Sequence, residues 1–163
     1  MSEESYSLFI EAIDFKNIEV ISLECRQNEG FKSEGKMLDI YLDHYIEKAT
    51  MSGVELDVKV GFNAFAYKSK EEIQNPKDDV GYDDKLFEVN FTLKLKYSLN
   101  LEEDEETLIK ISSDEELMNL FVERNVPINV WPYAREIISN VTMKMGFPPL
   151  MIPPYKSAFE YKG

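Results

Sequence analysis

The sequence holds few residues whose type and spacing could support catalysis or metal binding. Its only histidine, His44, follows Asp43 but has no acidic or cysteine partner at the spacing of a metal site, so we expect a surface or structural role. The only cysteine, Cys25, lacks the second cysteine of a CxxC motif, and we expect a buried apolar thiol rather than a nucleophile. Phosphate-binding loops, nucleophile elbows and HExxH motifs do not occur. The sequence therefore predicts no enzymatic activity, no cofactor and no metal site.

Length and charge indicate one acidic globular domain. The 163 residues carry a formal net charge of −13, and such a protein repels the phosphates of nucleic acids and anionic lipids. No apolar run approaches the ~20 residues that span a bilayer. The segment Met1–Glu4 lacks the basic start and apolar stretch of a secretion signal, and a single cysteine cannot form an internal disulfide. We therefore expect a cytoplasmic protein that neither binds nucleic acid nor inserts into a membrane.

Two segments alternate apolar and polar residues in the manner of long antiparallel strands. They cover residues 54–66 and 87–99, and strands of this length are expected to twist strongly or to carry a bulge near Gly61. The polar connection between them contains the acidic run Asp78–Asp84, which lacks the spacing and the closing glutamate of a calcium loop. A solvated hairpin loop is predicted there.

Other segments give weaker signals. Residues 8–25 are β-like, with room for a hairpin break near Lys16–Asn17, and residues 37–46 fit a strand and a helix equally well. The run Glu102–Glu106 is predicted to be a solvated loop, followed by a short strand at Thr107–Ser112.

Two helices are predicted in the second half of the chain. The first follows the capping box Ser113–Glu116. The second begins near Pro132, which suits a first helical turn, and ends before Gly146, which suits a left-handed C-cap. Their apolar stripes have helical spacing and comprise Leu117, Leu120 and Phe121 in the first helix, and Ala134, Ile137, Ile138, Val141 and Met145 in the second.

The last quarter of the chain differs in composition from the acidic body. Residues 126–163 hold six of the seven prolines but only two of the 31 acidic residues. Its prolines exclude both a helix and a central strand after Gly146, so this segment must lie extended over an apolar surface. It is either a simple strap over the core or one wall of an apolar groove for extended peptides.

The stretch from Val126 to Ser139 resembles the signature of the SecB family of bacterial export chaperones. It carries Pro127, Trp131, Pro132, Tyr133 and Arg135 at the family's spacing, although a valine precedes Pro127 where the family has cysteine, and Trp131 replaces phenylalanine. The following turn, which contains Gly146 and Pro148, and the segment Lys36–Leu42 also look like their family counterparts.

The resemblance implies an α+β fold in which helices pack on one face of a four-stranded antiparallel sheet. It divides a single domain of residues 1–163 into four parts. These are a mostly β body of residues 1–112, its crossover connection at 26–53, two helices within 113–146, and a proline-rich strap at 147–163. The family has a further helix and tail where this chain has only eight residues after Tyr155, and the segment Leu101–Glu106 looks inserted.

The resemblance also implies a function. Family members form dimers and tetramers, hold unfolded precursor proteins in apolar grooves without ATP, and deliver them to the motor protein SecA. Some SecB-like proteins serve toxin–antitoxin systems instead. By analogy, the client-binding residues are Leu38, Ile40, Leu42, Tyr45, Phe147, Leu150, Met151, Ile152 and Tyr155. Structural roles are expected for Pro127, Trp131, Pro132, Tyr133, Arg135, Gly146 and Pro148, with Arg135 binding a loop carbonyl or carboxylate.

Two other classes of function are alternatives to a holdase chaperone. An acidic protein that mimics DNA would need carboxylates arrayed at phosphate-like spacing, whereas the acids here are scattered through loops and polar strand positions. An enzyme of an unrecognised type would need a nucleophile, a metal site or a marked pair of carboxylates. The sequence favours the holdase.

Overall fold

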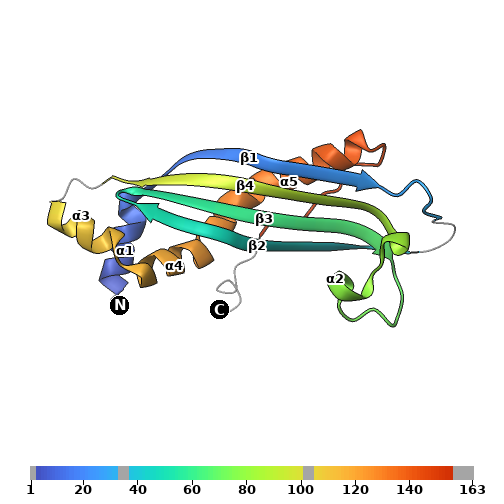
Figure 1. Ribbon diagram of the computed structural model, residues 1–163, viewed down its shortest axis with the longest axis horizontal. Helices are drawn as coiled ribbons and strands as arrows, with labels where there is room; N and C mark the ends of the chain where they lie inside the picture. The colour runs from blue at the N-terminus through green and yellow to red at the C-terminus, as the bar shows by residue number, and fades with distance from the viewer. Residues whose placement is uncertain (1–2, 33–36, 101–104, 156–163) are drawn as a thin grey trace.

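Four long antiparallel strands organise the chain (Figure 1). The computed structural model describes residues 3–32, 37–100 and 105–155. In chain order the elements are α1 (Glu3–Ala12), β1 (Ile13–Gln27), β2 (Leu38–Ser52), β3 (Glu55–Lys68), α2 (Pro76–Asp79), a 3-10 turn η1 (Tyr82–Asp84), β4 (Lys85–Leu99), α3 (Glu105–Ser112), α4 (Glu115–Arg124) and α5 (Val126–Lys144). The two long strands predicted at residues 54–66 and 87–99 and the predicted α+β fold class are confirmed.

The strand order is β1-β4-β3-β2, so β1 and β2 form the two edges of the sheet. Strands β2 and β3 form a hairpin around Gly53, whose φ of 61° lies in the left-handed region that glycine adopts without strain. Strand β1 pairs antiparallel with β4. The backbone of each edge strand therefore has a neighbour on one side only within the described sheet.

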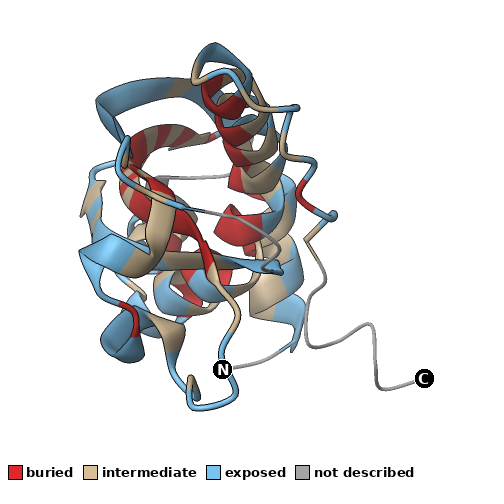
Figure 2. Cartoon of the chain, turned by 90° about the vertical axis from the view of Figure 1, so that its right-hand side faces the viewer, coloured by how far each residue is buried: buried red, intermediate tan, exposed pale blue. Residues whose placement is uncertain are grey.

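The core lies between one face of the sheet and the helices. Alternate residues of the central strands, such as Val60 and Phe62 of β3 and Leu93 of β4, face this side and are buried. Helix α5 contributes Ala134 and Ile138, and Figure 2 shows the buried residues gathered where helices and sheet meet. Among the described residues, no helix has the length and apolar character needed to cross a bilayer.

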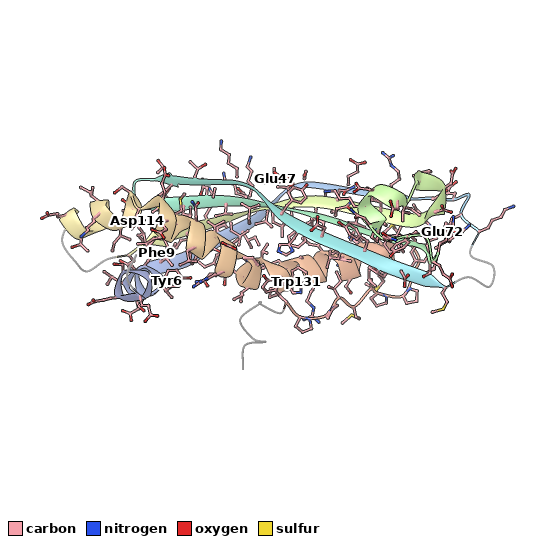
Figure 3. The ribbon with its side chains drawn as sticks, turned by 90° about the horizontal axis from the view of Figure 1, so that it is seen from below. Tyr6, Phe9, Glu47, Glu72, Asp114 and Trp131 are labelled. Atoms are coloured by element: carbon pink, nitrogen blue, oxygen red, sulfur yellow. The ribbon has the colours of Figure 1, made fainter. Side chains whose placement is uncertain are left out.

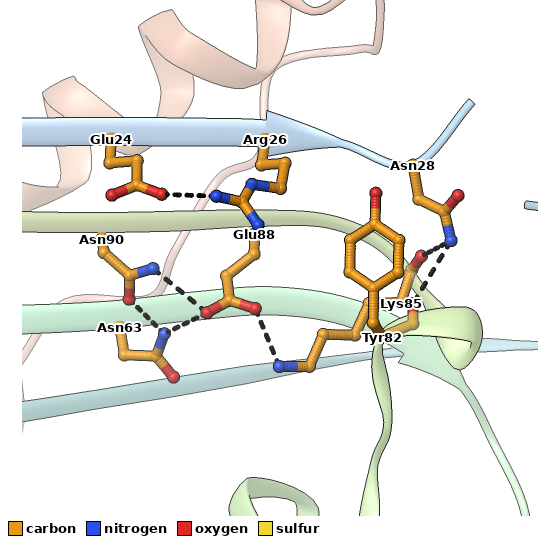
Figure 4. Close-up of polar contacts among 8 residues, drawn as sticks. All are labelled: Glu24, Arg26, Asn28, Asn63, Tyr82, Lys85, Glu88 and Asn90. Carbon is orange, nitrogen blue, oxygen red and sulfur yellow. Dashed lines mark hydrogen bonds and ion pairs between the residues drawn. The ribbon is translucent and has the colours of Figure 1, made fainter. Parts of the chain in front are cut away.

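The opposite face of the sheet is largely polar apart from a small buried cluster of Phe65, Tyr67 and Val80. Glu88 on β4 accepts hydrogen bonds from Asn63, Asn90 and Lys85, the last at 2.8 Å (Figure 4). Burial acts to raise the pKa of Glu88, but the hydrogen bonds from Lys85, Asn90 and Asn63 and the charge of Lys85 together lower it below the usual value. Asn28 donates to the carbonyls of Tyr82 and Lys85 and so ties the end of β1 to the start of β4.

Several local predictions were wrong. Residues 8–12 belong to helix α1, because Phe9 and Ala12 lie three residues apart on a helix and both enter the core, where Phe9 meets the ring of Phe121 at 5.5 Å. Residues 107–112, predicted as a short strand, are helical in α3. Glu106 lies in the first turn of that helix, where its dipole favours an acidic side chain. Of the inserted-looking segment, residues 101–104 lie outside the described residues.

Helix α5 begins at Val126, one turn and a half before the predicted start. Pro127 takes the first-turn position that suits proline, and Pro132 lies inside the helix. Pro132 has no amide hydrogen and cannot donate a hydrogen bond to the carbonyl of Ile128. Ile128 is exposed, so water can donate to this carbonyl instead. Gly146 has the predicted positive φ, at 91°.

Three further expectations need correction. The cap of α4 is Asp114 rather than Ser113, because the Asp114 carboxylate accepts hydrogen bonds from the amides of Glu116 and Leu117. Gly61 forms regular pairs with both neighbouring strands. The bulge near Gly61 lies on the neighbouring strand β2, between Ile46 and Lys48, and not on β3 itself. The absence of a side chain at Gly61 leaves room for the ring of Tyr45. Cys25 is exposed, because it lies on the edge strand β1.

The polar network around Glu88 predicts a pH-dependent contribution to stability. A carboxylate whose pKa is lowered by folding stabilises the native state above the ordinary value of 4.5, and this contribution is lost as the pH falls through the folded-state pKa. Glu88→Gln should reduce the free energy of unfolding by about 1 kcal/mol at pH 7 and by much less at pH 3, as measured by urea denaturation. The control is Glu24→Gln, which removes an exposed ion pair with Arg26 and should cost less than about 0.5 kcal/mol. Equal losses in both variants would contradict the assignment.

Candidate functional site

The strap returns along helix α5 after the turn at Gly146. Several hydrogen bonds hold its described part, residues 147–155, against the helix, beginning with that from the amide of Phe147 to the carbonyl of Thr142. The amide of Leu150 donates to Thr142 Oγ1 at 2.9 Å, Arg135 Nε donates to the carbonyl of Ile152 at 2.7 Å, and Trp131 Nε1 donates to the carbonyl of Pro153 at 2.7 Å. The prediction that Arg135 binds a loop carbonyl is confirmed.

Four rings from four different elements meet between β2 and the strap. His44 of β2 lies 6.0 Å from Phe62 of β3, 5.6 Å from Trp131 of α5 and 5.8 Å from Tyr155 of the strap, measured between ring centroids. Trp131 also contacts Phe62 at 6.0 Å and Tyr155 at 5.3 Å. We call these four residues the aromatic cluster. Figure 3 shows Trp131 on the helical side of the sheet.

Strand β2 presents apolar side chains beside this cluster. Leu38, Ile40, Leu42 and Ile46 share the helix-facing side of the sheet with His44, because their partners on β3 belong to the side chains that face the core. Leu38, Ile40 and Ile46 are exposed, since β2 lies at the edge of the sheet. Together with the aromatic cluster and the exposed Met151 of the strap, they form what we call the β2–strap surface.

The predicted client-binding residues do not all lie on this surface. Ile152 is only 5% exposed, and Leu42, Phe147 and Leu150 also pack against the core, with the ring of Phe147 5.5 Å from that of Phe87. The strap is therefore in large part a cover over the core. Exposed positions are Leu38, Ile40 and Met151, the last being 71% exposed, and Tyr155 is half-buried in the aromatic cluster.

Tyr45 lies on the other face of the sheet. It pairs with Gly61, whose neighbours Val60 and Phe62 point into the core, so Tyr45 and Gly61 share the polar side. The alternation of strand residues separates Tyr45 from Ile40 and Leu42, which it was predicted to join. We therefore leave Tyr45 out of the β2–strap surface.

The residues of the predicted structural motif take several roles. Pro127 is buried at the start of α5, Trp131 and Arg135 bind the strap, and Pro132 and Pro148 are exposed. Tyr133 is also exposed and points away from Trp131, toward Phe15 of β1, with their ring centroids 6.3 Å apart.

A second apolar surface lies at the opposite edge of the sheet and was missed by sequence reasoning. The exposed residues Phe15, Val20 and Leu23 of β1 share the helix-facing side. Two cavities of about 350 and 270 Å³ lie beside them, the first lined by residues that include Phe15 and Ile128, the second by residues that include Val20, Tyr133 and Ile137. We call this region the β1-edge surface. Register shifts at Phe15/Asn17 and Val20/Ser22 break the alternation that would have revealed it.

The chemistry of these two surfaces is that of apolar contact. Within residues 3–32, 37–100 and 105–155, no three histidine, cysteine, aspartate or glutamate side chains are grouped as metal ligands. His44 is the titratable side chain at the centre of the aromatic cluster. Burial lowers the pKa of His44, and the charge of Asp43 offsets this only in part. From the sequence, only a surface or structural role was expected for His44, because all three of its aromatic neighbours come from distant segments of the chain.

Comparisons with known proteins agree with this architecture. Residues 66–160 match the family model described as preprotein translocase subunit SecB. The protein-export protein SecB of Wolbachia sp. subsp. Drosophila simulans (strain wRi) is 40% identical over 60 residues, which cover 36% of this chain and 35% of that protein. The protein-export protein SecB of Mesorhizobium japonicum is 36% identical over 94 residues, which cover 48% of this chain and 53% of that protein. The alignments thus span about a third to a half of these curated relatives.

Among solved structures, a SecB-like chaperone of Mycobacterium tuberculosis in complex with a ChAD peptide from the HigA1 antitoxin is similar in fold. The TM-score is 0.68 at 13% identity, over 94% of this chain and 98% of that one. The family model alone covers more than half of the 163 residues, so the chain belongs to the SecB family.

Proposed function

We propose that this protein is a holdase chaperone that binds unfolded or precursor polypeptides on its β2–strap surface without ATP and without catalysis. The observation that supports this most is the aromatic cluster of this member of the SecB family, in which His44 lies on the same strand as the exposed Ile40 and Tyr155 lies on the same strap as the exposed Met151. Contiguous exposed apolar residues mark binding sites in soluble proteins, and methionine adapts to partners of different shape. The expected location is the cytoplasm, where precursors await export.

The net charge of −13 is compatible with this activity. Mutual repulsion between copies of an acidic protein opposes aggregation through exposed apolar residues. A holdase can therefore keep such a surface open to clients. Delivery of clients to SecA is the export role that family membership suggests.

A second candidate is a dedicated chaperone of a toxin–antitoxin system. It is favoured by the likeness in fold to the mycobacterial SecB-like chaperone, which was solved with an antitoxin peptide. Both candidates use the same chemistry, an extended peptide on an apolar surface. The two candidates differ in the partner. An export chaperone binds a broad set of precursors, whereas a chaperone of a toxin–antitoxin system binds one antitoxin.

We also propose that the protein forms a homo-oligomer, a dimer or tetramer, through the β1-edge surface. An edge strand with unpaired backbone groups and exposed Phe15, Val20 and Leu23 is suited to pairing with a second copy. The cavities beside it offer space for side chains of that copy.

Replacing exposed apolar residues of the β2–strap surface by aspartate should weaken client binding. In a light-scattering assay with a chemically denatured test protein, the wild type at an equimolar ratio should suppress aggregation without nucleotide. The double variant Ile40→Asp/Met151→Asp should weaken client affinity by about tenfold or more, because two apolar contacts are lost. The control Ile109→Asp alters an equally exposed residue of α3 and should behave as the wild type. An inactive wild type, or an active double variant, would refute the proposal.

Charges on the β1-edge surface should block self-association. Wild-type protein at micromolar concentration is expected to sediment as a dimer or tetramer, and Val20→Lys/Leu23→Lys as a monomer, because burial of two unpaired ammonium groups is unfavourable. Ile109→Lys again serves as the control. A monomeric wild type, or an oligomeric double variant, would show that this surface has another role.

A further inference from the structure

The aromatic cluster contains one side chain that can change its charge near neutral pH. His44 is the only histidine of the protein, and histidine is the side chain whose ordinary pKa lies between pH 5 and 8. Its ring is half-buried and contacts Phe62, Trp131 and Tyr155, so it lies where three elements other than its own meet. On β2 it follows Ile40 and Leu42 on the same face. A client that covers Ile40 and the cluster would also cover His44.

The other charged or titratable groups near His44 come from its own strand, the strap and α5. On its own strand, Asp43 is adjacent but points to the opposite face of the sheet. On the strap, Tyr155 meets the imidazole edge-on with its aromatic ring. On α5, the positively charged side chain of Arg135 lies one turn after Trp131 and donates to the carbonyl of Ile152. Strand β3 contributes Phe62, which does not titrate.

The electrostatic balance at this position favours the neutral imidazole. Water at the edge of the sheet and the faces of the neighbouring rings can partly stabilise a protonated His44. An apolar client segment would remove the water and would offer no compensating charge. Covering the ring therefore makes protonation more difficult than in the free protein.

We infer that His44 determines the pH range over which the β2–strap surface accepts apolar client segments, binding them when the imidazole is neutral and rejecting them when it is protonated. This rests on the proposed holdase function and adds a regulating residue to the same site.

The sign of the effect follows from linkage. If a bound client lowers the pKa of His44 below its value in the free protein, the client complex binds fewer protons than the free protein at intermediate pH. Client affinity is then greatest above the free-state pKa and falls as the pH decreases through it. If client binding lowers the pKa of His44 by one unit relative to the free protein, client affinity is about tenfold lower at low pH than at high pH.

The test uses a peptide whose own charge is constant. A fluorescent peptide of leucine, phenylalanine, serine and arginine, with capped ends, does not titrate between pH 5 and 8. Its dissociation constant is measured by fluorescence anisotropy with the full-length protein at pH 8, 7, 6 and 5, and circular dichroism at each pH verifies that the fold persists. For the wild type, the affinity should fall by about tenfold between pH 8 and pH 5.

Two variants separate titration from packing. His44→Phe keeps an aromatic ring, and its affinity should be high and independent of pH. His44→Gln keeps a polar neutral group and should also be independent of pH, at lower affinity. Because the protein has a single histidine, its imidazole resonance in an NMR titration reports His44 directly, and its pKa should be lower with bound peptide than without.

The outcomes distinguish the two proposals. Peptide binding that is unaffected by pH in the wild type would overturn the role of His44 and leave the holdase function intact. The same pH dependence in the wild type and in both variants would assign the effect to another group and would also overturn it. Absence of peptide binding at every pH would overturn the holdase function itself.

Discussion

The attachment of the strap to helix α5 is the constraint on which the candidate site depends. Trp131 and Arg135 lie four residues apart, so they share one face of the helix and donate to the consecutive carbonyls of Pro153 and Ile152. The strap cannot pair as a strand, because its prolines lack amide hydrogens and force an extended path. Side-chain donors on the helix therefore replace the backbone partners of a sheet. They place Tyr155 against Trp131 and His44 and thereby complete the aromatic cluster.

The sheet explains why apolar surface remains exposed at both edges. The central strands β3 and β4 are covered by helices on one face and paired on both sides, so their apolar residues are buried. The helices do not extend over the full width of the helix-facing side, and residues such as Val20 on β1 and Ile40 on β2 remain exposed there. A helix over the β1 edge would bury the surface proposed for self-association, and a helix over the β2 edge would bury the surface proposed for clients. The same architecture therefore provides two distinct apolar surfaces.

The sequence predicts the parts of this fold whose environment is set by local pattern. Strands β3 and β4 alternate cleanly because one of their faces is buried along its length, and the second half of α5 shows a helical stripe for the same reason. Helices α1 and α3 were missed, because short apolar segments of ambiguous period take their structure from tertiary contacts such as that of Phe9 with Phe121. For the site, the prolines after Gly146 predicted the extended strap, and Arg135 was expected to bind a loop carbonyl or carboxylate. The exposure of Cys25 could be predicted only with the strand order, and the face on which Tyr45 lies could be predicted only with the register.

His44 illustrates why a binding surface is harder to predict than a core. A lone histidine beside an aspartate, on an ambiguous segment, has no sequence feature that indicates function. Its significance comes from the register that places it opposite Phe62 and from the strap that brings Tyr155 to it. A purely apolar residue at this position would make a client surface that binds at every pH. An imidazole in the same place retains the packing of a ring, and it links client affinity to a proton through the desolvation that binding itself causes.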